Sequence, residues 1–268
     1  MNELVLEIGG IPSVLRCNQP LVLDQLAGRY RDYLIPEKAG FTLSITLLGA
    51  SGNPDLHGAI LEFEQDFIRL RGDLFEGEID LAAETARLVI DSRHAFEDSE
   101  YFLRLIYAFM AFKTGGVLLH AAGVVRQAAA FLFLGHSGSG KSTSVRLSKE
   151  FTILSDDMVL ITRREGQWLA ASTPFWNAGF PQSTPCSAPV KGLFFLHKAI
   201  EIKLQPLPRA EALAELITNI PVVTLDPARN DALIDRGFAI LSAIPAYRLS
   251  FLRDVPFWPS IEQGLGID

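Results

Sequence analysis

Residues 129–143 read AAFLFLGHSGSGKST, and this stretch decides how the larger part of the chain is interpreted. Its first six residues are an apolar run that ends at a glycine, which is typical of a buried strand. From Gly135 onward the sequence matches the P-loop pattern G-x-x-x-x-G-K-S. Residues 141–150 are predicted to be helical, with Val145 and Leu147 available for burial. The order of strand, glycine loop and helix is the structural context that the motif requires.

The residue types of this loop suit the binding of nucleotide phosphates. Glycines let successive backbone N–H groups turn toward one centre, where they form a nest for an anion at a helix N-terminus. Lys141 adds a positive charge for the β- and γ-phosphates, and Ser142 offers a hydroxyl to Mg²⁺. A chance match is expected in roughly one such chain in a hundred, which favours a phosphate-binding loop. The residues predicted to bind the nucleotide are Gly135, Ser137, Gly138, Ser139, Gly140, Lys141, Ser142 and Thr143.

The composition of the chain argues against several classes of protein. With 49% hydrophobic and 21% charged residues, the 268-residue chain can bury a substantial core and is not disordered. The net charge of −7, without any run of Lys or Arg, argues against a nucleic-acid partner. The acidic, alternating residues 1–7 do not resemble a signal peptide, and the longest apolar runs, such as residues 105–112, are too short to cross a membrane. Two cysteines without a C-x-x-C spacing indicate no disulfide framework, so we expect a cytoplasmic protein.

The first 96 residues are predicted to form a small α+β domain whose role the sequence does not reveal. Alternation of apolar and polar residues predicts strands at residues 4–8 and 41–47, and a further strand series over residues 59–91. Residues 21–33 have the three- and four-residue apolar spacing of a helix. We place the domain boundary before a second, well-buried helix that ends near Phe112, so that residues 97–268 form the nucleotide-binding domain.

Two further groups of polar residues flank the loop in the sequence. His120 lies in an apolar, strand-like stretch that is predicted to form an antiparallel hairpin with the strand before the loop. A single histidine in such a stretch is more often a core residue than a catalytic one. Asp156 and Asp157 follow a short apolar strand, as in a Walker-B motif, where one carboxylate serves Mg²⁺ and the other the attacking hydroxyl. Because adjacent acids repel each other, one of them is expected to have a raised pKa, which suits a general base.

The aromatic stretch at residues 172–181 allows two interpretations. It reads STPFWNAGFP, which is typical of a loop. It is either a packed loop without a direct role or a flap near the nucleotide or the acceptor.

Taken together, residues 116–157 resemble the catalytic core of HPr kinase/phosphorylase, and still more its shorter relatives, the HPr-kinase-like serine kinases. The shared pieces, in order, are Leu119-His120-Ala121, the loop from Gly135 to Ser142, and Leu154-Ser155-Asp156-Asp157. The resemblance implies a mixed, β-rich α/β core of the phosphoenolpyruvate-carboxykinase-like P-loop type. It also implies that His120 belongs to the active site, that Asp157 is the base, and that Asp156 lies nearer the metal.

The chain departs from this family at one place. The family's downstream Glu-Arg-Gly signature is absent, and residues 173–177 read TPFWN instead. The missing glutamate leaves the second metal ligand, the phosphorylase activity and HPr as a substrate without support. For the arginine that the family places near the end of its site, Arg209 is the candidate. The family's enzymes can assemble into oligomers, and the resemblance extends that option to this chain.

The sequence therefore predicts an ATP- and Mg²⁺-dependent kinase that phosphorylates a serine-type hydroxyl of a protein or peptide. A kinase for a small molecule or a natural-product peptide is one alternative. A nucleotide-binding regulatory module without phosphoryl transfer is the other; the absent downstream motif favours it, whereas the presence of Asp156, Asp157 and His120 counts against it. The sequence contains no N-K-x-D motif for reading guanine, which argues against a GTPase. The loop also lacks the final glycine of the G-x-S-x-G motif, which argues against a serine hydrolase. No Cys/His cluster indicates a structural zinc.

Overall fold

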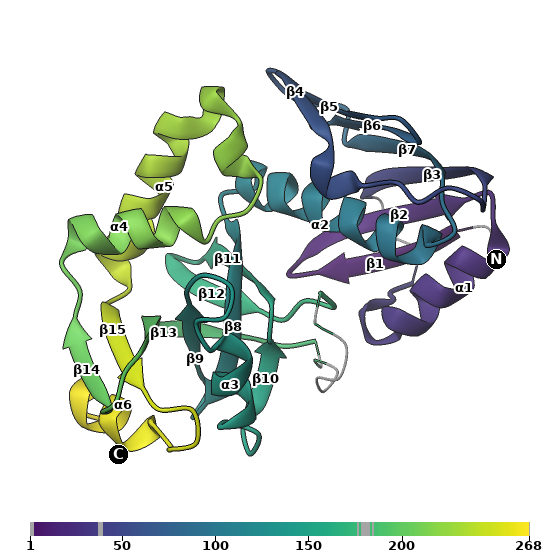
Figure 1. Ribbon diagram of the computed structural model, residues 1–268. Coiled ribbons are helices and arrows are strands. Elements are labelled where there is room, and N and C mark those ends of the chain that lie inside the picture. Colours follow the sequence, from purple (N-terminus) through teal and green to yellow (C-terminus); the bar gives the residue numbers. More distant parts are fainter. Residues whose placement is uncertain (1–2, 37–39, 176, 178–182, 184, 268) are drawn as a thin grey trace. The chain divides into compact units, whose positions relative to one another are not determined.

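The computed structural model describes residues 3–36, 40–175, 177, 183 and 185–267, in an α/β fold with two β-rich sheets and a few helices (Figure 1). The chain divides into two compact units, residues 1–113 and 114–268. The division follows the long helix α2 (Ala95–Lys113), whereas the sequence analysis placed the boundary before it. Among the described residues, no helix combines the length and the apolar character that a membrane span requires.

The first unit is built on a sheet with the strand order β1-β2-β3-β7-β6-β5-β4. Buried and exposed residues alternate along these strands, so that one face of the sheet is packed against α1 and α2. The strands are β1 (Glu3–Ile8), β2 (Ile11–Cys17), β3 (Phe41–Gly49), β4 (Ile60–Glu64), β5 (Phe67–Gly72), β6 (Phe75–Asp80) and β7 (Thr85–Asp91). The helical segments before α2 are α1 (Pro20–Arg29), η1 (Arg31–Tyr33) and η2 (Leu56–Gly58).

Helix α2 belongs to the first unit because its buried polar groups find their partners there. The hydroxyl groups of Tyr107 and Ser13 lie 2.8 Å apart in the interior. Arg29 of α1 donates to the carboxylate of Glu100 at 3.0 Å, and both side chains are largely buried. These bonds connect α2 to β2 and α1. The apolar spacing that predicted this helix does not reveal which sheet it covers, which explains the misplaced boundary.

The second unit is built on a sheet with the order β10-β8-β11-β12-β13-β15-β14, in which β9 pairs with both β8 and β13. The pairs β8–β11, β11–β12, β12–β13, β13–β9 and β9–β8 form a closed circuit of strands. The bounds are β8 (Val117–Arg126), β9 (Ala129–Leu134), β10 (Thr152–Ser155), β11 (Met158–Arg164), β12 (Gln167–Ala171), β13 (Ser187–Lys198), β14 (Lys203–Pro206) and β15 (Ala246–Phe251). The predicted hairpin before the loop is confirmed, since β8 and β9 are antiparallel neighbours.

Three neighbouring strands of this sheet run parallel and end at the same edge. Strand β13 pairs in parallel with β9 on one side and with β15 on the other. Phe195 of β13 lies opposite Leu134, the last residue of β9, and Lys198 lies opposite Phe251, the last residue of β15. The segments that follow β9, β13 and β15 therefore meet at the carboxyl edge of these three strands.

An aromatic core supports this edge. Phe131 and Phe133 of β9 pack edge-on against Trp258, with ring centroids 5.1 Å and 6.0 Å from the indole. Burial of these large rings contributes much of the unit's hydrophobic stabilisation. The helical segments of this unit are α3 (Lys141–Arg146), α4 (Arg209–Thr218), η3 (Val223–Leu225), η4 (Pro227–Arg229), α5 (Asn230–Ala243) and α6 (Trp258–Leu265).

Several elements differ from the sequence prediction. The helix predicted over residues 21–33 ends at Arg29, and the separate turn η1 covers residues 31–33. Strand β2 was not predicted, because Pro12 interrupts a pattern that is otherwise alternating. Helix α3 ends at Arg146 and not near residue 150. Beyond it, the N–H of Ser148 donates to the carbonyl of Val145, three residues back, so the α-helical bond pattern is lost. The hydroxyl of Ser148 also accepts a hydrogen bond from the indole of Trp258, which fixes this turn.

Candidate functional site

The glycine-rich loop, residues 135–140, joins β9 to α3 and has glycine where its backbone needs it. Gly135, Gly138 and Gly140 have φ angles of +146°, +76° and +117°, in the region that side chains other than glycine rarely adopt. A Cβ atom on Gly140 would lie 2.4 Å from the ring of Phe251, whereas one on Gly138 would meet nothing within 4 Å. Gly138 therefore faces open space, and Gly140 is packed against the end of β15.

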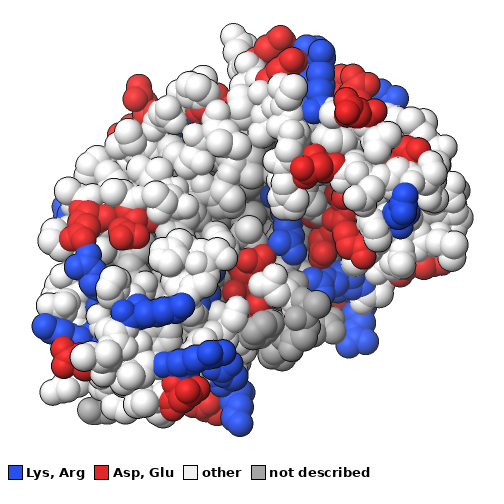
Figure 2. Space-filling model, in the orientation of Figure 1, with Lys and Arg blue, Asp and Glu red and all other residues white. Residues whose placement is uncertain are grey.

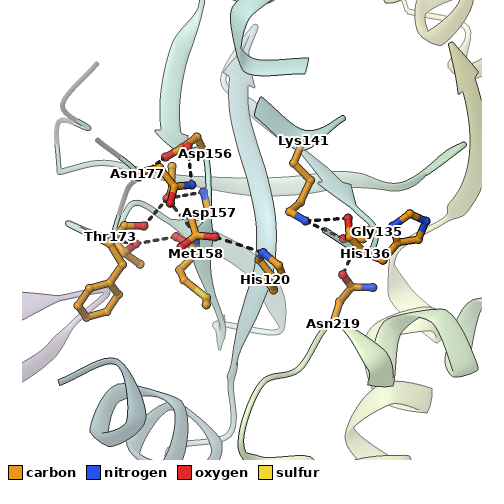
Figure 3. A network of polar contacts seen from close by, with 12 residues as sticks. His120, Gly135, His136, Lys141, Asp156, Asp157, Met158, Thr173, Asn177 and Asn219 are labelled. Atoms are coloured by element: carbon orange, nitrogen blue, oxygen red, sulfur yellow. Dashed lines mark hydrogen bonds and ion pairs between the residues drawn. The ribbon is translucent and has the colours of Figure 1, made fainter. Parts of the chain in front are cut away.

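Lys141 is buried over the backbone of this loop. Its side chain is 7% exposed, and its ammonium group donates to the carbonyl oxygen of Gly135 at 2.7 Å and to that of His136 at 3.3 Å (Figure 3). Burial lowers the pKa of this ammonium group, and the negative charge of Asp157 opposes the shift. The ammonium group of Lys141 is therefore hydrogen-bonded to main-chain oxygens of the loop that precedes α3.

His120 and Asp157 face each other beside the loop. The Nε2 atom of His120 lies 3.2 Å from a carboxylate oxygen of Asp157. The main chain fixes the pair, because Ala121 N–H donates to the carbonyl of Asp157 and Met158 lies opposite His120 in the ladder between β8 and β11. The imidazole is one-third exposed, so it is not the fully buried core histidine that the apolar stretch favoured. In Figure 3 it lies between the aspartates and the loop.

Asp156 points to a different partner. One of its oxygens accepts from the backbone N–H of Asn177 and the other from the Asn177 side-chain amide, both at 3.0 Å. Burial raises the pKa of Asp156, the two bonds from Asn177 lower it, and the charge of Asp157 raises it further. The expected raised pKa is therefore found at Asp156, where burial is a larger cause than repulsion between the acids. The turn itself is held by the Ser155 hydroxyl, which accepts from the N–H groups of Asp157 and Met158.

The loop, the histidine and the two aspartates line one pocket in the second unit, with a volume of about 780 Å³. That size is within the usual range of small-molecule sites. Gly135 and Ser139, both predicted to bind nucleotide, do not line it: each is buried in the base of the loop. The lining residues are His120, Ser137, Gly138, Gly140, Lys141, Ser142, Thr143, Asp156, Asp157, Asn177, Lys198, Ala199, Phe251, Leu252 and Arg253.

Sequence reasoning missed two cations of this pocket, Lys198 and Arg253. Lys198 is the last residue of β13, and Arg253 follows β15 by two residues. Both side chains are exposed, and neither forms an ion pair with another residue that the structure describes. Figure 2 shows several basic side chains on the lower part of this unit, interspersed with acidic ones. Lys198 and Arg253 reach the pocket because β13 and β15 run parallel to β9 and end at the same edge, and no sequence motif marks this pairing. Arg209, named on the family resemblance, is exposed at the beginning of α4 and does not line the pocket.

The aromatic stretch at residues 172–181 is described only in part. Trp176 and residues 178–182 lie outside the described residues, so whether this stretch is a flap stays a prediction. Thr173 and Phe175 are fully buried, and the Thr173 hydroxyl donates to the carbonyl of Met158 at 2.6 Å. The first residues of the stretch are therefore packed behind the aspartates.

These observations define a two-unit α/β protein in which a glycine-rich loop and an acidic pair of the larger unit line the same polar pocket. Residues 99–266 match the family model described as SynChlorMet cassette protein ScmC. Because the match covers more than half of the 268 residues, the chain belongs to this family. The assignment to HPr-kinase-like serine kinases was therefore wrong. The three short motifs that suggested it span only residues 119–157, whereas the family match extends across almost the whole second unit. No curated protein matched the chain.

Proposed function

We propose that this protein is an ATP- and Mg²⁺-dependent kinase that transfers the γ-phosphate to a serine-type hydroxyl of a protein or peptide. The observation that carries the proposal is one pocket lined by both the glycine-rich loop with Lys141 and the Asp157–His120 pair. Phosphoryl transfer needs little covalent chemistry from the protein, and it depends on groups that position the reactants and neutralise charge. The pocket offers both kinds of group.

The cations and donors of the pocket suit a polyphosphate. Lys141, Lys198 and Arg253 outnumber the two aspartates, so the pocket carries a net positive charge when His120 is neutral. The side chains of Ser142 and Thr143 add hydroxyl groups at the beginning of α3. To contact phosphate, the Lys141 ammonium group would exchange its two carbonyl acceptors for phosphate oxygens, which bind an ammonium ion more strongly because they are charged.

The donor set also fits Mg²⁺. This ion prefers oxygen ligands, keeps several waters, and is usually held by one or two carboxylates together with the substrate's phosphates. The pocket supplies the Ser142 hydroxyl and the carboxylate of Asp156, and the described residues contain no cluster of three or more His, Cys, Asp or Glu side chains that could hold a metal alone. Each oxygen of Asp156 accepts one bond from Asn177 and retains a second lone pair. Bound there, Mg²⁺ would neutralise charge on the phosphates.

Asp157 is the residue that we propose as the base. Its carboxylate faces the pocket beside His120, with 3.2 Å between the paired atoms. An acceptor hydroxyl that reaches Asp157 could give up its proton there as its oxygen attacks phosphorus. The Nε2–H group of His120 would donate to one carboxylate oxygen of Asp157 and hold it in position, which leaves the other oxygen to accept the proton. This division of roles agrees with the partners of the two acids, since Asp156 is bonded to Asn177 instead.

We also propose that the second unit is a P-loop core of the phosphoenolpyruvate-carboxykinase-like type. The strand–loop–helix order around residues 135–140 and the mixture of parallel and antiparallel pairs support this finer class.

A second function has an observation in its favour. Asp156 and Asp157 are the two carboxylates of the pocket, and none of its other described residues is acidic. If Asp157 is not available to the metal, a second acidic metal ligand is missing, and a nucleotide-binding regulatory module without phosphoryl transfer would not need one. The family description names a cassette and no activity. Products of that cassette are therefore the first acceptors to test, together with small molecules and natural-product peptides.

The test is incubation of the purified protein with γ-labelled ATP and Mg²⁺, with and without candidate acceptors. We expect label on an acceptor, and its loss in Lys141→Ala. Lys149→Ala is the matched control, because Lys149 is exposed and does not line this pocket. Nucleotide that binds but is never transferred, with any acceptor, would favour the regulatory module. Transfer that survives Lys141→Ala would refute the assignment of the site.

A further inference from the structure

Asn219, the residue that follows α4, is hydrogen-bonded both to the base of the glycine-rich loop and to the strand that carries His120. Its side-chain oxygen accepts a hydrogen bond from the N–H of Gly135 at 3.1 Å, and its main-chain oxygen accepts from the N–H of His120 at 2.8 Å (Figure 3). Its side-chain NH₂ group donates to the carbonyl of Glu215 at 2.8 Å. The residue is 3% exposed, although it lies in no motif.

The two contacts are made at the points where two strands reach the site. Gly135 is the first residue after β9, so its N–H is beyond the strand ladder and needs another acceptor. Its carbonyl in turn accepts from the ammonium group of Lys141. A hydrogen-bonded series therefore runs from Asn219 through Gly135 to Lys141. A shift of Asn219 would move the first peptide of the glycine-rich loop and the resting position of the lysine.

Asn219 closes the end of α4, and a tight, strained chain reversal follows it. The N–H of Asn219 donates to the carbonyl of Leu216. Three residues later, Val222 has φ +67° and ψ −51°, and the N–H of Val223 donates to the carbonyl of Pro221 at 2.8 Å. This is a classic γ-turn, a rare conformation that is unfavourable for a β-branched residue. Strain of this kind persists only where the surrounding structure fixes the backbone.

We propose that Asn219 is a positioning residue for phosphate binding, which acts by holding Gly135 and, through it, the loop and Lys141. The inference rests on the proposed nucleotide site. Without the side-chain oxygen, the Gly135 N–H is buried with no acceptor, and the loop must move to satisfy it. The contact to His120 uses the main chain of Asn219, so a substitution at this position leaves that acceptor in place.

The test compares Asn219→Ala with Thr218→Ala. Thr218 is exposed, and its hydroxyl donates to the same Glu215 carbonyl that Asn219 uses and accepts a long bond of 3.5 Å from the Asn219 amide. Its loss therefore perturbs the end of α4 and the NH₂ side of Asn219 but leaves the oxygen that holds Gly135. We expect MgATP, measured by calorimetry, to bind about tenfold more weakly to Asn219→Ala and with wild-type affinity to Thr218→Ala. Amide exchange followed by NMR should show Gly135 losing protection in Asn219→Ala while His120 keeps it.

A second variant, Asn219→Asp, retains an oxygen acceptor and should keep the Gly135 amide protected, which supports the inference even if Asn219→Ala is too unstable to study. Equal MgATP affinity in Asn219→Ala and Thr218→Ala, with Gly135 protected in both, would overturn the inference. A different result, in which Lys141→Ala binds MgATP as the wild type does, would overturn the proposed nucleotide site. The rate of amide hydrogen exchange at Gly135 in the Asn219 variants would then still decide whether Asn219 holds the loop.

Discussion

Gly140→Ala and Gly138→Ala should differ in their effect on stability, although both substitutions add one methyl group to the same loop. Both glycines have positive φ angles, +117° and +76°. The added Cβ at residue 138 meets open space, whereas at residue 140 it would lie 2.4 Å from the Phe251 ring. The pair therefore separates the backbone cost from the packing cost.

The magnitudes follow from these two surroundings. A left-handed backbone costs a non-glycine residue about 1–2 kcal/mol, so Gly138→Ala should lower the free energy of unfolding by about that amount. Gly140→Ala adds an overpacking cost of about 1–3 kcal/mol. The Phe251 ring is unable to yield easily, because it is 4% exposed and packs edge-on against the buried Phe257 at 6.0 Å between centroids. The total for Gly140→Ala is about 2–5 kcal/mol.

Tryptophan fluorescence during urea unfolding is the suitable assay. All three tryptophans of the chain lie between residues 168 and 258, within the second unit, so the signal reports the unit that carries the loop. Free energies of unfolding come from linear extrapolation in urea. Equal destabilisation by Gly140→Ala and Gly138→Ala would show that the end of β15 does not restrict the loop, and our account of its shape would be wrong.

Three other outcomes are expected. Asp157→Asn should keep the affinity for MgATP, measured by calorimetry, and lower phosphoryl transfer by about a hundredfold or more, as expected for a general base; unchanged transfer would move that role elsewhere. The double variant Lys198→Ala/Arg253→Ala should weaken MgATP binding more at low than at high ionic strength, and an equal loss at both would argue against contact with phosphates. Tyr107→Phe should cost the first unit about 1–2 kcal/mol, because Ser13 loses its buried partner. Circular dichroism in urea measures this cost, and wild-type stability would show that the bond is not important.

Local sequence patterns predicted most strands and the residues closest to the loop. Alternation and glycine boundaries located β8 and β9, and the acidic pair was found because it directly follows a short apolar strand. The roles of Asp156 and Asp157 remain predictions, but their different surroundings could not be predicted. Asn177 lies twenty residues beyond Asp157, and nothing in the sequence indicates that its amide reaches Asp156.

The remaining site residues depend on which strands become neighbours. Lys198 and Arg253 reach the pocket because β13 and β15 run parallel to β9, and parallel pairs between distant segments leave no local signal. The same limit explains the boundary error at α2, since apolar spacing shows that a helix is buried but not what covers it. The family error has another cause: the resemblance rested on three motifs of a few residues each, and motifs this short recur in unrelated proteins.

The closed circuit of strands has a consequence for how the protein is made. Strand β9, which precedes the glycine-rich loop, pairs with β13, which comes about sixty residues later in the chain. Gly140 is packed against Phe251, which comes later still. While the ribosome is still adding those segments, residues 129–143 have no partner on that side, and their apolar strand is exposed to chaperones or to aggregation. The first unit, complete at residue 113, faces no such delay. During synthesis the protein should therefore gain a folded first unit well before the glycine-rich loop is packed in its final position.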